Sequence, residues 1–500
     1  MATLKSLVRG VMALDPDAPA LEHDKQWRTW GDLSQIIDSI EAILAQNAIG
    51  PGTRVGGILR TTPEIAAAVI GTVVNDRCVV TLNPAMPDAK LAADIAQSKP
   101  PVIFAETQDW LRPEIAEAAA SIGSLGIELT GDKSAPVRVI QEMKGTDFKR
   151  EAHGIGIEML TSGTTGTPKR VPLNAANFDR MVLDASVFES RDVTQAPRLS
   201  KAVAILNTPF AHIGGLFSLF VTLSAGRKAC LLERFRIEEF VDALQRHQPK
   251  AIGIPPSALR MILDADVPRE ALASLVVVRA AMAPLDPNLA EQFEDRYGVP
   301  VLQNYGATEF AGGVAGWTMD DHRKMGKLRR GSVGRMNPGI EGRIVDLETG
   351  EPLSFGETGL LELRAKHLGD GQSWVRTTDL ARMDEDRFLW IEGRADNAII
   401  RGGFKVFPDD VVRAIEAHPA VLEACVVSMP DERLGQVPGA AYKVKSGRVV
   451  GEDELRAFLR QRLTAYQIPV LLKQVEDFPR TPSMKPCQPE LRKLLEHVTA

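Results

Sequence analysis

The chain has 500 residues, of which 44% are hydrophobic and 25% are charged. This length predicts two or more domains, and this composition excludes an intrinsically disordered or collagen-like chain. The net charge of −6 argues against a general nucleic-acid binder.

The cysteines and the apolar runs indicate where the protein works. Cys78, Cys230, Cys425 and Cys487 lie far apart and form no Cys-x-x-Cys pair, so neither a disulfide framework nor a structural zinc is expected. The N-terminal stretch lacks the apolar core of a signal peptide. The longest run of low polarity, Ile213–Ala225, is too short to span a bilayer. We therefore expect a cytoplasmic protein without a membrane span.

Helices and strands are expected to alternate over the first 300 residues. The patterns predict helices at 4–15, 30–44, 63–74, 108–122, 213–225, 237–247 and 287–297. They predict strands at 55–59, 78–82, 102–105, 202–207, 228–232, 251–254, 276–279 and 301–303. This rhythm predicts an α/β fold with layered, mostly parallel sheets and helices on both faces.

The pattern changes near Gly331 to short strands and turns, which predicts a β-rich, barrel-like subdomain. Beyond Arg394 the strands and helices predict a small α+β domain of about a hundred residues, which is large enough to fold alone. The expected domains are a large N-terminal one over residues 1–395 and a small C-terminal one over residues 396–500.

Residues 161–170 read Thr-Ser-Gly-Thr-Thr-Gly-Thr-Pro-Lys-Arg. Gly163 and Gly166 permit tight turns and a close approach to a ligand. The hydroxyl groups and Lys169 offer donors and a positive charge, which suit a polyphosphate. The spacing differs from that of a Walker A loop. The alternative interpretation is a flexible solvent loop.

Four further polar clusters follow. Tyr305–Glu309 offers a carboxylate and a hydroxyl suited to Mg²⁺, and Asp379 can accept hydrogen bonds from two ribose hydroxyls. Arg394, and then the Arg401–Gly403 stretch, combine cationic groups with permissive backbone. Lys485 lies in a Pro- and Ser-rich loop. Taken singly, each has an ordinary structural interpretation as a turn or a solvated side chain.

In this order the clusters resemble the motifs of the adenylate-forming superfamily, which comprises acyl-CoA synthetases, adenylation domains and luciferases. The resemblance extends from about Trp30 to Lys485. It implies a large domain that binds ATP and an acid, a mobile C-terminal lid, and the use of ATP, Mg²⁺ and CoA. The implied activity is that of an acid–CoA ligase, which forms acyl-AMP and pyrophosphate and then passes the acyl group to the thiol of CoA.

The resemblance also implies roles for individual residues. The implied catalytic residues are Lys485, Glu309 and His212, and the implied Mg²⁺ ligands are Thr161 and Glu309. The implied ATP- or AMP-binding residues are Thr161, Ser162, Gly163, Thr164, Thr165, Gly166, Thr167, Lys169, Ala283, Asn304, Tyr305, Gly306, Thr308, Asp379 and Arg394. The implied CoA tunnel comprises Arg401, Gly402, Gly403 and Phe404, and the implied hinge is Asp396. The implied acyl pocket comprises Phe210, His212, Ile213, Gly214, Ala281, Met282 and Ala307. For His212, an ordinary buried histidine is the alternative.

Several positions depart from the usual residues of that superfamily. Arg170 stands in place of a glycine, Ala281-Met282 in place of a Gly-Gly pair, and Met484 in place of a glycine. None of these changes removes a charged catalytic group, so we expect an active enzyme with an altered pocket. The small apolar lining favours an aromatic or medium-chain aliphatic acid over a dicarboxylate.

Two other functions stay open at this point. One is a stand-alone adenylation enzyme that loads the phosphopantetheine of a carrier protein, and the other is a non-catalytic nucleotide-binding relative. The expected partners are a carboxylic acid, ATP and CoA, with no nucleic acid. The oligomeric state is open, with a homodimer among the alternatives.

Overall fold

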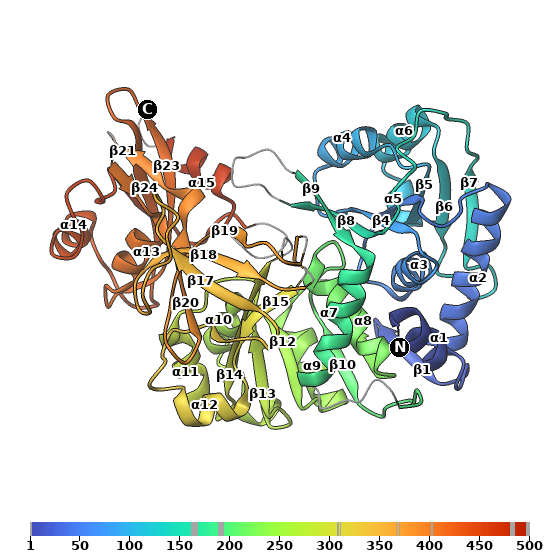
Figure 1. The fold of residues 1–500 in the computed structure, drawn as a ribbon, viewed down its shortest axis with the longest axis horizontal. Helices are drawn as coiled ribbons and strands as arrows, with labels where there is room; N and C mark the ends of the chain where they lie inside the picture. The colour runs from blue at the N-terminus through green and yellow to red at the C-terminus, as the bar shows by residue number, and fades with distance from the viewer. Residues whose placement is uncertain are drawn as a thin grey trace. The chain divides into compact units, whose positions relative to one another are not determined.

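The computed structural model describes residues 3–161, 169–188, 195–307, 310, 312–366, 368–369, 371–401, 404–480 and 486–496. The chain forms two compact units, residues 1–314 and 315–500, and each is described here by itself (Figure 1). The boundary predicted at residues 395 and 396 lies inside the second unit and stays a prediction. Every helix in these ranges is too short or too polar to serve as a transmembrane segment.

The first unit contains a seven-stranded sheet in the order β7-β6-β5-β3-β4-β8-β9. The inner strands are parallel, and the edge strands β7 and β9 are antiparallel to their neighbours. The strands are β3 (Arg54–Ile58), β4 (Cys78–Leu82), β5 (Val102–Glu106), β6 (Leu125–Leu129), β7 (Val137–Gln141), β8 (Ile155–Thr161) and β9 (Lys169–Asn174). Because the carboxyl ends of parallel strands meet at one edge, the loops after β3, β4, β5 and β8 leave the sheet together.

Helices cover both faces of this sheet (Figure 1). They are α1 (Leu4–Met12), α2 (Trp30–Gln46), α3 (Pro63–Val74), α4 (Asp88–Ser98), α5 (Thr107–Trp110), α6 (Pro113–Ile122) and α7 (Ala175–Phe188). α3 is buried along almost its whole length in the larger core, together with α2. α4 and α6 pack side by side over a separate core on strands β3, β4 and β5. The predicted α/β layers are thus confirmed.

Two smaller sheets complete the first unit. One has the order β10-β11-β1-β2, with β1 (Pro19–His23), β2 (Gln26–Thr29), β10 (Val203–Leu206) and β11 (Lys228–Leu231). The other holds the parallel strands β12 (Ala251–Ile254), β13 (Val277–Ala280) and β14 (Val301–Ala307). Helices α8 (Ile213–Ser224), α9 (Ile237–His247), α10 (Pro256–Asp264) and α11 (Pro287–Tyr297) connect and cover these strands.

The second unit contains the predicted β-rich region and the small α+β region. The first is an antiparallel meander of β16 (Gly334–Met336), β20 (Phe388–Arg394), β19 (Val375–Met383), β18 (Gly359–Arg364) and β17 (Glu341–Val345), with α12 (Met319–Met325) before it and β15 (Gly312–Gly316) pairing with β16. The second is a sheet of β21 (Ile399–Arg401), β22 (Phe404–Val406), β23 (Val421–Asp431), β24 (Gly435–Val444) and β25 (Leu471–Gln474) with helices α13 (Pro408–Glu416), α14 (Glu452–Arg460) and α15 (Gln488–Glu496). It has two apolar cores of its own.

Candidate active site

The predicted phosphate loop connects β8 and β9, which form an antiparallel hairpin. Thr161 pairs with Lys169 across it, and Leu160 pairs with Arg170. Because β8 runs parallel to β4, the hairpin leaves the sheet at its carboxyl edge, where ligands of α/β proteins bind. Residues 162–168, which include the predicted phosphate contacts Ser162 to Thr167, lie outside the described residues, as do the side chains of Thr161 and Lys169.

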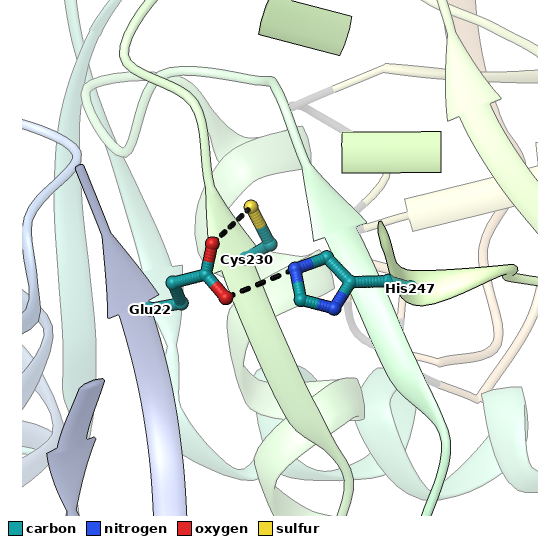
Figure 2. A group of neighbouring side chains, drawn as sticks. All are labelled: Glu22, Cys230 and His247. Carbon is teal, nitrogen blue, oxygen red and sulfur yellow. Dashed lines mark hydrogen bonds and ion pairs between the residues drawn. The ribbon is translucent and has the colours of Figure 1, made fainter. Parts of the chain in front are cut away.

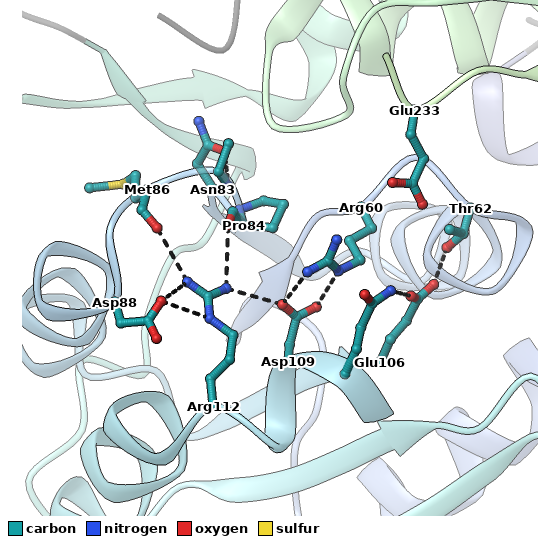
Figure 3. Close-up of polar contacts among 12 residues, drawn as sticks. Arg60, Thr62, Asn83, Pro84, Met86, Asp88, Glu106, Asp109, Arg112 and Glu233 are labelled. Atoms are coloured by element: carbon teal, nitrogen blue, oxygen red, sulfur yellow. Dashed lines mark hydrogen bonds and ion pairs between the residues drawn. The ribbon is translucent and has the colours of Figure 1, made fainter. Parts of the chain in front are cut away.

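A polar network fixes the other loops at this edge (Figure 3). The buried carboxylate of Asp109 accepts two hydrogen bonds from Arg60, at 2.8 and 2.9 Å, and one from Arg112 at 3.1 Å. Arg112 also donates to the carbonyl oxygens of Pro84 and Met86, at 3.3 and 3.2 Å. One guanidinium therefore ties the loop after β4 to the start of α5. Sequence reasoning missed this network because its members are ordinary charged residues far apart in the chain.

The predicted acyl-pocket residues meet at two loops of the first unit. Phe210 is fully buried, and His212 occupies the N-cap position of α8 without a side-chain capping hydrogen bond. Met282 lies in the loop after β13, and its Sδ lies 3.9 Å from Thr208 Oγ1. It also lies 3.7 Å from the position that a Cβ on Gly214 would take. The loop after β10 and the loop after β13 are thus in contact, as the predicted pocket requires.

Asn207 is a polar residue at this place that sequence reasoning missed. It directly follows β10, and its Nδ2 donates to the Gly253 carbonyl oxygen at 3.0 Å. Its Oδ1 is buried, and no donor in the described part of the chain reaches it. Asparagine at the carboxyl end of a buried strand was the available signal.

The end of β14 holds the residues predicted to contact adenine. Asn304 and Tyr305 are half-buried, and the Tyr305 ring lies 6.3 Å from that of Phe310. A Cβ on Gly306 would come within 2.2 Å of the Gly312 carbonyl oxygen, so only glycine fits there. Ala283 follows the neighbouring parallel strand β13 and therefore lies at the same sheet edge. Thr308 and Glu309 lie outside the described residues.

In the second unit, three predicted site residues come together. Asp379 on β19 pairs across the sheet with Arg394 on β20, and the Arg394 Nε lies 3.9 Å from Asp379 Oδ1. Arg394 also makes two 3.0 Å hydrogen bonds to Asp396 and one of 2.5 Å to Thr378 Oγ1. The Asp379 side chain is 15% exposed. Two carboxylates are thus held on either side of one guanidinium.

The predicted tunnel residues Arg401 and Phe404 lie on the β21–β22 hairpin. The Arg401 Nη1 donates to the carbonyl oxygens of Tyr466 and Ile468, at 2.8 and 3.1 Å. The Phe404 ring stacks on Tyr466 with centroids 4.8 Å apart and is 58% exposed. Arg401 therefore fastens the 466–468 segment, and Phe404 offers an aromatic surface. Gly402, Gly403 and Lys485 lie outside the described residues.

A cluster of potential metal ligands lies elsewhere in the first unit (Figure 2). The ligand atoms of Glu22, Cys230 and His247 all lie within 4.8 Å of one another. However, the Arg246 Nη1 lies 2.5 Å from Glu22 Oε1 and 2.9 Å from His247 Nε2. Burial, with a further contribution from Glu22, raises the pKa of the Cys230 thiol to about 12. A guanidinium already neutralises the carboxylate, so the cluster is a buried charge network.

Comparisons with known proteins agree with this geometry. The family model of the AMP-binding enzymes matches residues 9–371, and that of the AMP-binding enzyme C-terminal domain matches residues 413–485. The chain therefore belongs to the AMP-binding enzyme family. It is an enzyme of the AMP-forming acyl-CoA synthetase class, whose shared chemistry is ATP-dependent acyl adenylation.

Two CoA ligases and one solved structure illustrate the degree of similarity. The chain is 27% identical to the peroxisomal OPC-8:0-CoA ligase 1 of Arabidopsis thaliana, over 93% of this chain and 88% of the relative. It is also 27% identical to the sulfoacetate–CoA ligase of Cupriavidus necator, over 99% and 98%. Its fold is similar to that of ATP-bound MatB from Rhodopseudomonas palustris, with a TM-score of 0.82, 23% identity and full coverage of both chains.

Proposed function

We propose that this enzyme is an acid–CoA ligase. In the first half-reaction the carboxylate oxygen of the acid attacks the α-phosphorus of ATP, and the bond to the bridging oxygen of pyrophosphate breaks. In the second, the thiol sulfur of CoA attacks the acyl carbon, its proton passes to solvent, and AMP leaves. The observation that carries the proposal is the Asp379–Arg394–Asp396 group, formed by two adjacent strands and the turn that follows them, in a chain that matches both family models.

The predicted residues divide the work as follows. Asp379 accepts hydrogen bonds from the two ribose hydroxyls. Its carboxylate has four lone-pair positions, and the Arg394 guanidinium orients it. Tyr305 and the backbone near Ala283 hold the adenine. The 162–168 loop with Lys169 surrounds the β- and γ-phosphates. Lys485 neutralises charge that develops between the carboxylate and the α-phosphate, an effect that is large in a dry site.

Mg²⁺ is typical for this class, and the proposed ligands are the side chains of Thr161 and Glu309. A hydroxyl and a carboxylate are the oxygen ligands that this ion prefers. When bound, the ion supplies positive charge to the transferring phosphoryl group.

The acid is proposed to be aromatic or medium-chain aliphatic. Phe210, Ala211 and Met282 give the pocket region a mainly apolar character, and within the described residues of these two loops no arginine or lysine side chain is placed to pair with a second carboxylate. A dicarboxylate such as succinylbenzoate, the substrate that names one relative, is therefore expected to be a poor substrate.

A panel of carboxylic acids, assayed for pyrophosphate release with and without CoA, tests the proposal. It should include benzoate, cinnamate and octanoate, with sulfoacetate and a dicarboxylate for comparison. Acid-dependent pyrophosphate release together with a CoA thioester supports the ligase. Release without a CoA product, rescued by a phosphopantetheinylated carrier protein, supports the carrier-loading alternative. No release with any acid would exclude both.

A further inference from the structure

Arg170, which stands directly after the last residue of the predicted phosphate loop, has a buried set of partners. Its Nη2 donates to Asp94 Oδ2 on α4 at 2.6 Å, and its Nη1 donates to the Thr81 carbonyl oxygen on β4 at 3.4 Å. Its Nε lies 3.7 Å from Glu158 Oε1 on β8. Glu158 is also paired with Arg54 on β3, at 2.6 Å. Three neighbouring elements, α4, β4 and β8, are therefore connected to β9 through one guanidinium, and β3 joins them through Glu158.

The four charged side chains form a continuous chain, Arg54–Glu158–Arg170–Asp94. Arg54 and Asp94 are each 6% exposed, and Glu158 and Arg170 are each 15% exposed. Burial raises the pKa of Asp94, and the positive charge of Arg170 opposes that shift. Two carboxylates thus face two guanidinium groups, and no net charge is buried. Buried pairs of this kind contribute little to stability and are better suited to fixing one geometry.

The register of the β8–β9 pairing places this network directly next to the predicted phosphate loop. Thr161 and Lys169 are the last paired residues before the loop, and Leu160 and Arg170 are the pair below them. The direction in which the chain enters and leaves residues 162–168 is therefore set within one residue of the network. Arginine fits this role because its planar fork can engage a carboxylate and carbonyl oxygens together.

We propose that Arg170 is a positioning residue, which fixes the base of the phosphate loop so that the loop is preorganised for the triphosphate of ATP. The inference rests on the proposed role of residues 162–168. It assigns a function to a position where the superfamily usually has glycine. Arg170 acts through the backbone of β9 and touches Asp94, Glu158 and Thr81, with no direct contact to substrate required.

Nucleotide binding to the full-length protein tests this proposal, by isothermal titration with MgATP and, separately, with AMP. AMP lacks the β- and γ-phosphates and serves as an internal control. For Arg170→Gly we expect the Kd for MgATP to rise about tenfold and the Kd for AMP to change less than twofold. Arg170→Lys should also weaken MgATP binding, because it keeps the charge and loses the fork.

Two further variants separate positioning from folding and from charge. Asp94→Leu combined with Arg170→Leu removes both partners without a change in net charge and leaves no uncompensated buried ion. We expect it to keep the wild-type melting temperature and still to weaken MgATP binding. Arg138 lies on β7, at the opposite edge of the same sheet, and forms an ion pair with Glu128 on β6. Arg138→Gly removes this pair and should leave both Kd values unchanged.

Two outcomes would overturn the inference. One is equal weakening of MgATP and AMP binding in Arg170→Gly, and the other is wild-type MgATP binding in the double leucine variant. The readout does not depend on which acid is the substrate. If these variants bind MgATP normally and also adenylate acids, the role of Arg170 is refuted and the proposed function is unaffected. A wild type that binds no MgATP would refute the proposed function as well.

Discussion

Among the predicted pocket residues that the structure describes, Met282 has the most unusual backbone conformation. Its φ angle is 75°, in the left-handed region, where a residue with a side chain is strained by about 1–2 kcal/mol. Strain of this kind is retained where a site uses it. The side chain contacts Thr208 and lies over Gly214, so it fills space at the junction of the two pocket loops.

Met282→Gly should therefore enlarge the pocket without unfolding the protein. Relief of the strain offsets the entropic cost of glycine, about 0.5–1 kcal/mol, so the free energy of unfolding should change by about 1 kcal/mol or less. The ratio of kcat/KM for a longer acid to that for a shorter one should rise about tenfold, since one methylene is worth roughly 1–3 kcal/mol in an apolar pocket. Ala281→Gly, which removes a single methyl group from the same predicted pocket, should raise this ratio less. An unchanged acid profile in Met282→Gly would remove this residue from the pocket.

A pH effect on stability belongs to His23, whose Nε2 lies 3.5 Å from Glu233 Oε1. The hydrogen bond to Glu233 raises the pKa of His23 above 6.5, although burial opposes it, and the same bond lowers the pKa of Glu233 below 4.5. Because the histidine pKa is raised, the pair stabilises the fold below about pH 6.5, and this contribution is lost as pH rises through the pKa of His23 in the folded state. Because the carboxyl pKa is lowered, the pair also stabilises the fold above about pH 4.5, and this contribution is lost as pH falls through the pKa of Glu233 in the folded state.

The His23–Glu233 pair should thus stabilise the fold most between about pH 4.5 and 6.5. Melting temperatures of the wild type and His23→Gln, compared from mildly acidic to alkaline pH, check this. We expect the two to differ most in that window and to converge at alkaline pH. A difference that grows with pH would contradict the assigned direction of the histidine shift.

How much of the site could be predicted depended on how far apart along the chain its residues lie. Asp379, Arg394 and Asp396 were predicted from short motifs, and the strand pairing brings them together. The partners of Arg170 and the Glu22–Cys230–His247 cluster join positions that are tens to hundreds of residues apart. No local pattern marks such contacts, because they arise only when strands and helices pack.

The predicted hinge residue, Asp396, lies in the 3₁₀ turn η3 (Ala395–Asn397). It directly follows β20, and the Arg394 guanidinium is bonded to Asp396. Arg413 of α13 donates to the carbonyl oxygen of Glu392, on β20, at 2.8 Å. These contacts hold the β20 end of the turn in this conformation.

Asp396→Pro should separate the two half-reactions. Proline fixes φ near −65° and removes the backbone donor, so rotation about this turn is restricted. We expect adenylation within about twofold of wild type and thioester formation at least tenfold slower, a difference of about 1.4 kcal/mol or more. Asp396→Ala, which loses the bonds to Arg394 and keeps the freedom to rotate, is the control. Normal overall turnover in the proline variant would refute the hinge.

The predicted elements failed where polar or proline residues obscured the pattern. The single helix expected over 108–122 is divided into α5 and α6, because Pro113 begins the second helix. No helix was predicted at α10, which begins at Pro256, because the consecutive prolines Pro255 and Pro256 after the strand obscure the helical pattern. α4 was missed because its buried face includes Asp94 and Ser98, which interrupt the apolar stripe. The amphipathic helix α2 and the almost uniformly apolar helix α3 were predicted correctly.

For the whole molecule, the proposed chemistry draws on both units. The loops of residues 162–168, 210–214 and 281–283 belong to the first, and Asp379, Arg394 and Lys485 belong to the second. The residues with proposed roles are thus distributed over both units of the chain. The activity is therefore expected only from the full chain.

Lys485→Ala tests the second unit's share. Loss of the lysine should reduce adenylation by a factor of about 100 to 1,000, typical for one electrostatic contact at a developing charge. Thioester formation from supplied acyl-AMP should fall less than threefold. Rapid-quench measurement of each half-reaction checks this, with Lys473→Ala as the control. Equal loss of both half-reactions would contradict the assigned role.

The most direct measurement is acid-dependent exchange of labelled pyrophosphate into ATP by the wild type and by Asp379→Ala. The wild type should exchange only when a carboxylic acid is present. Asp379→Ala should lower kcat/KM for ATP at least about 100-fold, since two hydrogen bonds to a charged acceptor are worth roughly 1.5–3 kcal/mol each. Arg376→Ala, on the same strand and 53% exposed, should exchange like the wild type. Exchange without any acid, or full exchange in Asp379→Ala, would contradict the account.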